Sequence, residues 1–303
     1  MKPFIAFAVF LFMFSAGPAI GVQPGKKFAI QLHRPMKVGT KVRLTVKGES
    51  SSEEERTVGT DTSSRKSMFK MEFRGVLTVK EITRDGGASK LGIMVEKFTL
   101  TEDGKTHEAL EKGTRLAAAL NGRLEVFALV AKDGKLRPLE DMRVVQALRI
   151  VVTLNNEGDA NDDDIFGSKV ARATGEKWPI NKRLAIANMK RDGIILKPEK
   201  FSGQTRFPRV VKVGEVECVF LEGEFNATEF RPPIPKEFEV SESEFVAEYS
   251  GKFPLDKRLP ELETTVDVRT SFTALAPAKG DRPAVDWSST QRTRKHIWVE
   301  PLD

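Results

Sequence analysis

The segment 155–167, which reads NNEGDANDDDIFG, carries the densest group of acidic side chains in the chain. Carboxylate and amide oxygens at short spacing are the ligands that calcium prefers in proteins. The segment could therefore bind a metal ion, or it could only connect two elements of the fold. The candidate ligands are Asp159, Asn161, Asp162 and Asp163.

The EF-hand pattern, aligned from Asp159, fails at its two most diagnostic positions. It requires a glycine where Asp164 stands and a bidentate glutamate where Val170 stands. An irregular calcium site is the alternative. We favour a surface connector in which Asn161 or Asp162 caps a short helix, because a cap oxygen accepts a hydrogen bond from a free backbone N–H group.

Other metal and catalytic patterns are missing from the sequence. The histidines are His33, His107 and His296, and the zincin-like run HEALE has Glu111 where a second histidine is required. No Gly-x-Ser-x-Gly elbow and no phosphate-binding glycine loop occurs. We therefore predict no catalytic residue and no cofactor. An extracellular hydrolase that uses paired carboxylates stays open, because a sequence gives no distances between its acids.

Cys218 is the only cysteine, so the chain forms no internal disulfide. It lies in an alternating apolar run and is predicted to be buried and unreactive. Trp178, Trp287 and Trp298 could stack on a ligand, or they could anchor the core.

The first 21 residues (1–21) read as a secretory signal peptide. Lys2 precedes an apolar run at 4–14, and small residues precede a cut before Val22. The apolar run is short for a membrane span, and retention as an anchor is the alternative. We expect residues 22–303 to be secreted or periplasmic, soluble after cleavage, and without a later transmembrane segment.

The chain has a formal net charge of +6 and a pI near 9.3. Its basic residues are mixed with 43 acidic ones, and no basic tract is interleaved with aromatic residues. We therefore predict no nucleic-acid partner. The partner stays unknown, with a lipophilic ligand or an envelope component as candidates.

The pattern of residues 22–137 predicts antiparallel strands. KVRLTVKG at 41–48 alternates between apolar and polar side chains. The polar stretch 51–67 is predicted to be a loop or a frayed strand pair, and Gly75 to mark a bulge. Asn121-Gly122 predicts a type I′ hairpin turn.

Residues 138–193 change to a helical period. Pro138 fits the first position of a helix, and the run INKRLAIANMKRDG (180–193) predicts a second helix that ends before Gly193. Strand patterns return at 194–303. This order predicts one α+β domain over 22–303, with a curved antiparallel β-sheet, meander strands in both halves and two central helical segments packed on one face.

Three short motifs carry a resemblance to a family. They are KVGTKVRLTVKG at 37–48, the G-x-x-W segment TGEKWPIN at 174–181, and SGKFPLDKRL at 250–259. On these motifs the chain resembles a set of uncharacterised secreted bacterial proteins whose fold looks like that of the lipoprotein carriers. The resemblance implies a curved sheet with helices against its concave face, and it implies no catalytic residue.

We predict a secreted or periplasmic non-enzymatic protein that binds a lipophilic ligand or a protein partner between sheet and helices. The alternatives are the extracellular hydrolase and a structural or envelope-associated interaction protein. An apolar pocket would support the ligand-binding hypothesis, an acidic cleft would support the hydrolase, and a filled core without a pocket would support the interaction protein.

Overall fold

A computed structural model describes residues 25–302. The predicted signal peptide lies outside the described residues. The first-half strands are β1 (Lys27–Phe28), β2 (Lys41–Val58), β3 (Asp61–Ile82), β4 (Ala88–Glu102), β5 (Lys105–Glu108), β6 (Arg115–Asn121), β7 (Leu124–Val130) and β8 (Leu136–Pro138). The later strands are β9 (Arg172–Ala173), β10 (Lys177–Pro179), β11 (Phe201–Val213), β12 (Val216–Thr228), β13 (Glu239–Pro254), β14 (Glu263–Ala276) and β15 (Val285–Leu302). The helices are α1 (Met142–Val151), α2 (Asp162–Ile165), α3 (Lys182–Arg191) and the short 3-10 helix η1 (Pro198–Lys200).

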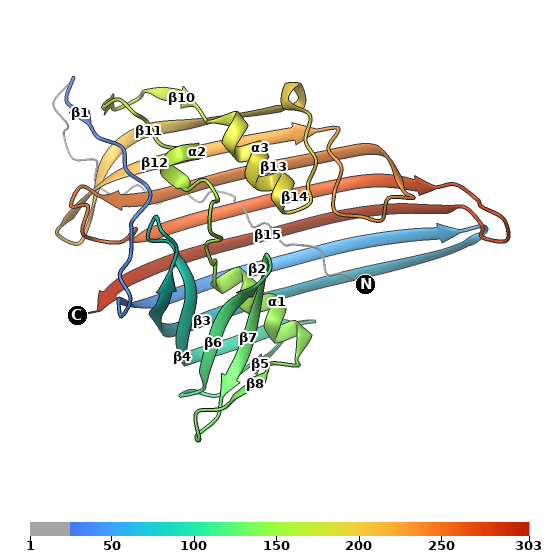
Figure 1. The fold of residues 1–303 in the computed structure, drawn as a ribbon, viewed down its shortest axis with the longest axis horizontal. Coiled ribbons are helices and arrows are strands. Elements are labelled where there is room, and N and C mark those ends of the chain that lie inside the picture. The colour runs from blue at the N-terminus through green and yellow to red at the C-terminus, as the bar shows by residue number, and fades with distance from the viewer. Residues whose placement is uncertain (1–24, 303) are drawn as a thin grey trace.

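Thirteen of these strands form one antiparallel sheet, in the order β10-β11-β12-β13-β14-β15-β2-β3-β4-β6-β7-β8, with β5 paired to β4. Each half of the chain is a meander, and the halves join where β15 pairs with β2 along its whole length. The sheet is open and curved, and the three α-helices lie in front of it in Figure 1. The predicted α+β class, with a curved antiparallel sheet and helices on one face, is confirmed.

Of the two alternatives predicted for the polar stretch 51–67, the strand pair is present and the loop is not. The stretch forms the outer halves of β2 and β3, which pair from Ser51 opposite Met68 to Val58 opposite Asp61. Serine and glutamate are weak strand formers, but β2 is paired on both sides, so its backbone groups are satisfied along the whole strand. These long strands project beyond the helices at one end of the molecule (Figure 1).

The first predicted helix begins later than Pro138 indicated. Pro138 lies in β8 and pairs with Ala128. The helix α1 begins after Asp141, whose side chain accepts hydrogen bonds from the backbone N–H groups of Arg143 and Val144. The helix therefore begins at its capping aspartate, Asp141, and not at Pro138.

The second predicted helix is confirmed. Asn181 caps the start of α3, and its side chain accepts a hydrogen bond from the Leu184 N–H. Lys190 and Arg191 lie in the last turn, where positive charge is favoured. Gly193 follows with φ +85°, as predicted for a helix end.

The predicted hairpin between β6 and β7 is present, but its turn is displaced by one residue. Asn121 pairs with Leu124, so the turn residues are Gly122 and Arg123. Gly122 has φ +63°, and neither Asn121 nor Arg123 has a positive φ. A type I′ turn at Asn121-Gly122 is therefore wrong. The bulge predicted at Gly75 is confirmed by a register shift between β3 and β4.

The core has two main parts on the helix-covered face of the sheet. One packs α1 against β2, β3, β4, β6 and β7. The other packs α2 and α3 against β11 to β14. A Cβ atom on Gly48 would lie 3.0 Å from Met71 Cγ and 3.1 Å from Ile150 Cγ2. The glycine therefore lets α1 approach β2 closely. The outer parts of β2 and β3, with the part of β15 that pairs with β2 there, carry the site described below.

Candidate functional site

The helix α1 forms one side of a groove on the helix-covered face. Arg143 fixes its first turn to the sheet, because its Nε lies 2.7 Å from Glu102 Oε1 and its Nη1 donates to Ser67 Oγ at 3.0 Å. Met142 is 54% exposed and Ile150 is buried, and both line the groove. This side of the groove therefore presents Met142 and Ile150 as apolar side chains, beside the polar lining residues Asp141, Arg143 and Gln146.

The proline-rich segment 231–238 forms the opposite wall. Arg231 holds this segment in shape by donating to the carbonyl oxygens of Phe238 at 2.7 Å and Pro235 at 2.9 Å. Ile234 is buried in a small cluster with Trp287, and the Phe238 ring lies 5.4 Å from the Trp287 ring. This loop lines the groove with the apolar side chains of Pro233, Ile234, Pro235 and Phe238.

The floor between these walls is polar. Ser52 on β2 lies opposite Ser67 on β3 and Gln291 on β15. Two residues further along the same face, Glu54 lies between Arg65 and Ser289. Within residues 25–302, the side chains of Ser52, Ser289 and Gln291 form no hydrogen bond, so their polar groups are free to meet a ligand.

The groove has a volume of about 980 Å³, which is in the range of small-molecule sites. Its inner end is closed where Ser50 Oγ and Thr293 Oγ1, both buried, lie 3.2 Å apart. Its outer end lies on the projecting strands. The apolar lining residues are Phe69, Met142, Ile150, Pro233, Ile234, Pro235, Phe238 and Trp287.

Two arginines stand at the outer end of the groove. The Arg56 guanidinium lies over the Trp287 ring at 4.1 Å from its centroid. Arg56 Nε is buried and has no hydrogen-bond partner. Arg65 is exposed. Neither arginine forms an ion pair with any residue of 25–302.

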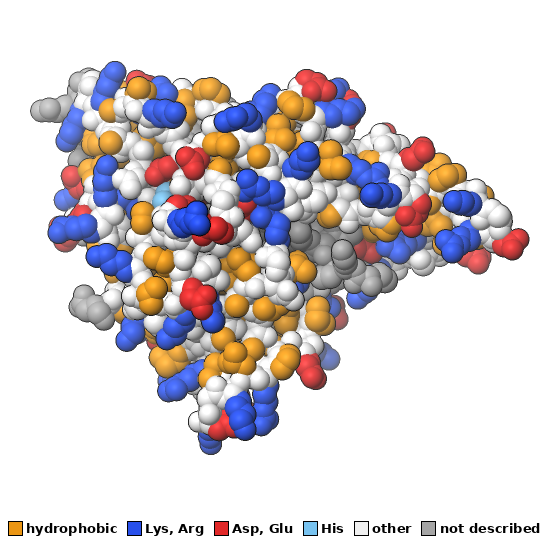
Figure 2. Space-filling view, viewed as in Figure 1, with side chains coloured by type: hydrophobic (Ala, Val, Ile, Leu, Met, Phe, Trp, Pro, Cys, Tyr) orange, Lys and Arg blue, Asp and Glu red, His pale blue; other side chains and the backbone are white. Residues whose placement is uncertain are grey.

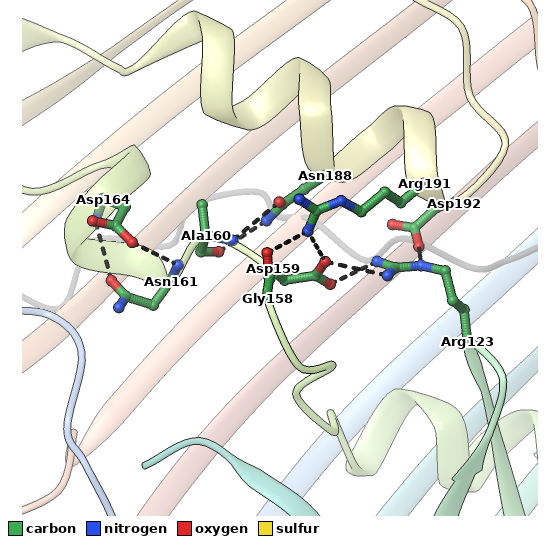
Figure 3. A network of polar contacts seen from close by, with 9 residues as sticks. All are labelled: Arg123, Gly158, Asp159, Ala160, Asn161, Asp164, Asn188, Arg191 and Asp192. Atoms are coloured by element: carbon green, nitrogen blue, oxygen red, sulfur yellow. Dashed lines mark hydrogen bonds and ion pairs between the residues drawn. The ribbon is translucent and has the colours of Figure 1, made fainter. Parts of the chain in front are cut away.

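The acidic segment 155–167 is occupied with contacts inside the protein (Figure 3). Asp159 forms ion pairs with Arg123, at 2.6 Å, and with Arg191. Burial works to raise the pKa of Asp159, but the two arginines outweigh it and the pKa lies below its ordinary value. Arg123 also pairs with Asp192 at 2.6 Å. The segment thus ties the β6–β7 turn to α3.

Asn161 caps α2, as the connector hypothesis predicted. Its side chain accepts a hydrogen bond from the Asp164 N–H, and the Asp164 carboxylate accepts one from the Asn161 N–H. Asp163 accepts a hydrogen bond from the Leu32 N–H at 2.6 Å, while Asp162 is exposed. No group of three or more His, Cys, Asp or Glu side chains among residues 25–302 is placed to hold a metal ion.

A third polar region lies inside the fold, beyond the closed end of the groove. Glu261 Oε1 is buried without a hydrogen-bond partner. Burial raises the pKa of Glu261 to about 8, although a hydrogen bond with Thr264 and the charge of Arg34 act in the opposite direction. Burial also lowers the pKa of Lys295 to about 8. The Lys295 ammonium donates to the carbonyl oxygen of Ile150 at 3.1 Å, at the end of α1.

Two strand glycines make room for this interior region. A Cβ atom on Gly251 would overlap the Glu261 carboxylate, and one on Gly223 would overlap the Tyr249 ring. Sequence reasoning missed both Glu261 and Tyr249. An isolated glycine inside a strand pattern indicates a close approach, so Gly223 and Gly251 were the signals available.

The three histidines lie apart from one another and from the groove. His33 Nε2 is 2.8 Å from the carbonyl oxygen of Asp85, and His107 is exposed on β5. His296 lies 3.0 Å from Glu263 and stacks on Trp298. The Trp298 ring therefore already stacks on another side chain of the protein.

Cys218 and two of the tryptophans are buried. Cys218 is buried as predicted, and burial raises the pKa of its thiol to about 11. Trp178 Nε1 donates to the Phe166 carbonyl oxygen at 2.9 Å, and Trp287 lies beneath Arg56. Trp178 and Trp287, 4% exposed each, have the buried-anchor role.

A second hollow of about 850 Å³ lies mainly on the opposite face of the sheet. Its charged side chains pair with one another across strands, as Lys252 does with Glu263 and Lys97 with Glu72, each at 2.5 Å. Paired charges on an open surface leave less for a ligand to satisfy. We therefore regard the groove between α1 and segment 231–238 as the stronger candidate site.

Comparisons with known proteins add little. No family model matches the chain, and no curated protein matches it. It is similar to a DUF1329 family protein from Desulfovibrio piger, with 10% identity, a TM-score of 0.19, and coverage of 84% of this chain and 83% of that one. It is also similar to the outer membrane protein OprG from Pseudomonas aeruginosa, with 5% identity, a TM-score of 0.18, and coverage of 90% and 100%. The third is the COG4313 outer membrane channel from Pseudomonas putida F1, with 10% identity, a TM-score of 0.20, and coverage of 92% and 99%.

At these TM-scores the likenesses carry no conclusion about fold or function. None of the three proteins is described as a lipoprotein carrier. Separately, none of the helices within residues 25–302 is long and apolar enough to cross a membrane.

Proposed function

We propose that this chain is a non-enzymatic binding protein that holds an amphipathic ligand in the groove between α1 and segment 231–238. One observation carries the proposal: a groove of about 980 Å³ has a polar floor between two walls that both present apolar side chains. A ligand seated there buries its apolar side against both walls and turns its polar side to the floor.

The chemistry of the floor narrows the ligand class. Contact with Met142 on one wall and Phe238 on the other stabilises apolar groups at about 25 cal/mol per Å² buried. A purely apolar ligand would also cover the hydroxyls of Ser52 and Ser289 without giving them a partner, which is unfavourable. The proposed ligand class is therefore narrower than lipophilic molecules in general, because the ligand must carry polar groups along one side.

The proposed location is outside the cytoplasm. Residues 1–21 carry the charge and apolar pattern of an export signal. Removal of this segment leaves 22–303 as one soluble α+β domain that is secreted or periplasmic. The resemblance to lipoprotein-carrier-like proteins agrees with a ligand held between the sheet and its helices.

The groove does not favour a hydrolase. Its acidic lining residues are Glu54 and Asp141. The Asp141 carboxylate already accepts two backbone hydrogen bonds at the start of α1. Glu54 is left as the uncommitted carboxylate among the described lining residues, whereas glycosidase-type chemistry needs a pair.

A second candidate function is association with an envelope surface. Exposed apolar side chains include Met94, Leu124, Val126 and Leu136, on β4, β7 and β8. Figure 2 shows hydrophobic side chains gathered over β6 and β7. Co-flotation of residues 22–303 with lipid vesicles tests this candidate, and protein that stays at the bottom of the gradient argues against it.

The ligand proposal is tested by retention. The protein, expressed with its own first 21 residues, is incubated with a total lipid extract, repurified and analysed by mass spectrometry. Ser52→Trp fills the groove floor, and Ser51→Trp places the same ring on the other face of the same strand. We expect an amphipathic molecule on the wild type and on Ser51→Trp but not on Ser52→Trp. Retention that is equal in both variants, or nil in the wild type, contradicts the proposal.

A further inference from the structure

We infer that the ligand of the groove is an amphipathic anion, whose acidic group binds between Arg56 and Arg65. This inference rests on the proposed function and adds the charge and the orientation of the ligand. The two arginines lie on the neighbouring strands β2 and β3, on the face that carries the groove.

The register of the strands places Arg56 and Arg65 at diagonal positions on one face of the sheet. Arg65 lies directly opposite Glu54, and Arg56 lies two residues further along β2 on the same face. Diagonal neighbours of this kind are roughly 7–8 Å apart at their Cα atoms, within reach of long side chains. An acidic group between them can accept hydrogen bonds from both.

The Arg56 side chain is held in place, and it keeps one hydrogen-bond donor that no protein atom uses. Its guanidinium is held against Trp287 at 4.1 Å, so little side-chain freedom remains to be lost on binding. Its Nε is buried and donates to no protein atom. A buried donor without a partner is unfavourable, and an anionic acceptor removes that penalty.

The other charged residues of the groove also indicate that the ligand carries a negative charge. Arg143 is committed to Glu102 and Ser67, and Asp141 to the start of α1. The uncommitted charges are then Arg56, Arg65 and Glu54. Glu54 faces Arg65 across the strands without forming an ion pair, so the outer end keeps an excess of one positive charge.

The dimensions set the orientation of the ligand. From Ser50 at the closed end to Arg56 at the outer end, β2 runs six residues, which is about 20 Å at 3.3 Å per residue. The apolar wall residues Phe69 and Ile150 lie toward the closed end. With its acid at the arginines on the projecting strands, the ligand extends its apolar tail inward, from Trp287 and Phe238 at the outer end toward these two residues.

The test compares a long-chain fatty acid with the fatty alcohol of the same chain length. Dissociation constants are measured by displacement of a fluorescent amphiphile from the wild type, Arg56→Gln, Arg65→Gln and Arg183→Gln. Arg183 is an exposed arginine on α3 without an ion pair and serves as the matched control. Arg65 is also exposed, so its replacement leaves the fold intact.

We expect the wild type and Arg183→Gln to bind the acid roughly tenfold to a hundredfold more tightly than the alcohol. Arg56→Gln and Arg65→Gln each reduce this preference to a few-fold or less, with alcohol binding unchanged. Equal binding of acid and alcohol by the wild type, abolished by Ser52→Trp, overturns this inference and leaves the proposed function standing. Binding of neither probe overturns both.

Discussion

The acidic segment 155–167 and the floor of the groove are both polar, but they use their polar atoms differently. In the segment, Asp159 pairs with two arginines and Asn161 with the backbone of α2. On the floor, Ser52 and Gln291 form no side-chain hydrogen bond within residues 25–302. The comparison teaches that a site is marked by polar groups left free, not by the density of polar residues in the sequence.

The largest expected difference between the two regions is in stability. Asp159→Ala leaves Arg191 and one side of Arg123 without a carboxylate, and both lie at the junction of β6, β7 and α3. We expect a loss of about 2 kcal/mol in the free energy of unfolding, measured with urea. Gln291→Ala, on the groove floor, should change it by less than about 0.5 kcal/mol. Equal losses in the two variants would remove the contrast.

The interior region around Glu261 differs from both, because one oxygen of this carboxyl group, Oε1, is buried without a hydrogen-bond partner. Its folded pKa of about 8 lies above its ordinary value of 4.5, so the folded protein holds a proton that the unfolded chain releases between these values. Stability therefore falls as the pH rises from about 4.5 to about 8.

Glu261→Gln removes this pH dependence. We expect the variant to gain about 1–2 kcal/mol over the wild type at pH 8 and little at pH 5. Urea unfolding at the two pH values measures the difference. Arg34, Asp162 and Lys295 also act on Glu261, and a gain that is the same at both pH values would mean that its titration is not the cause.

The smallest expected effect is that of calcium on the acidic segment. The four candidate ligands were Asp159, Asn161, Asp162 and Asp163, of which three already have protein partners. We therefore predict that added calcium leaves the Tm unchanged. An increase of several degrees would show that the ion competes successfully with Arg123 and Arg191.

The sequence predicted the parts of the fold that depend on local patterns. Alternation located the strands, the end of α3 before Gly193 followed from the local sequence, and capping by Asn161 followed from its residue type. Low strand propensity left the prediction for 51–67 open between a loop and a frayed strand pair, because pairing with β15 depends on residues far along the chain. The same long-range pairing hid the groove, since Ser50 and Thr293 are 243 residues apart in sequence.

The groove floor has one local signature that can be recognised afterwards. On β15, the side chains that share the floor face begin with Trp287 and continue with Ser289, Gln291 and Thr293. A buried central strand is normally apolar on its covered face. A polar inner face on such a strand therefore indicates a site, but only once the pairing of β15 with β2 shows that the strand is central.

Photo-cross-linking tests the central claim most directly. A fatty acid that carries a diazirine on its tail is bound to residues 22–303, irradiated, and the labelled peptides are identified by mass spectrometry. The account predicts label on α1 and on segment 231–238, and loss of both in Ser52→Trp but not in Ser51→Trp. Label confined to the opposite face of the sheet, or unaffected by Ser52→Trp, would contradict it.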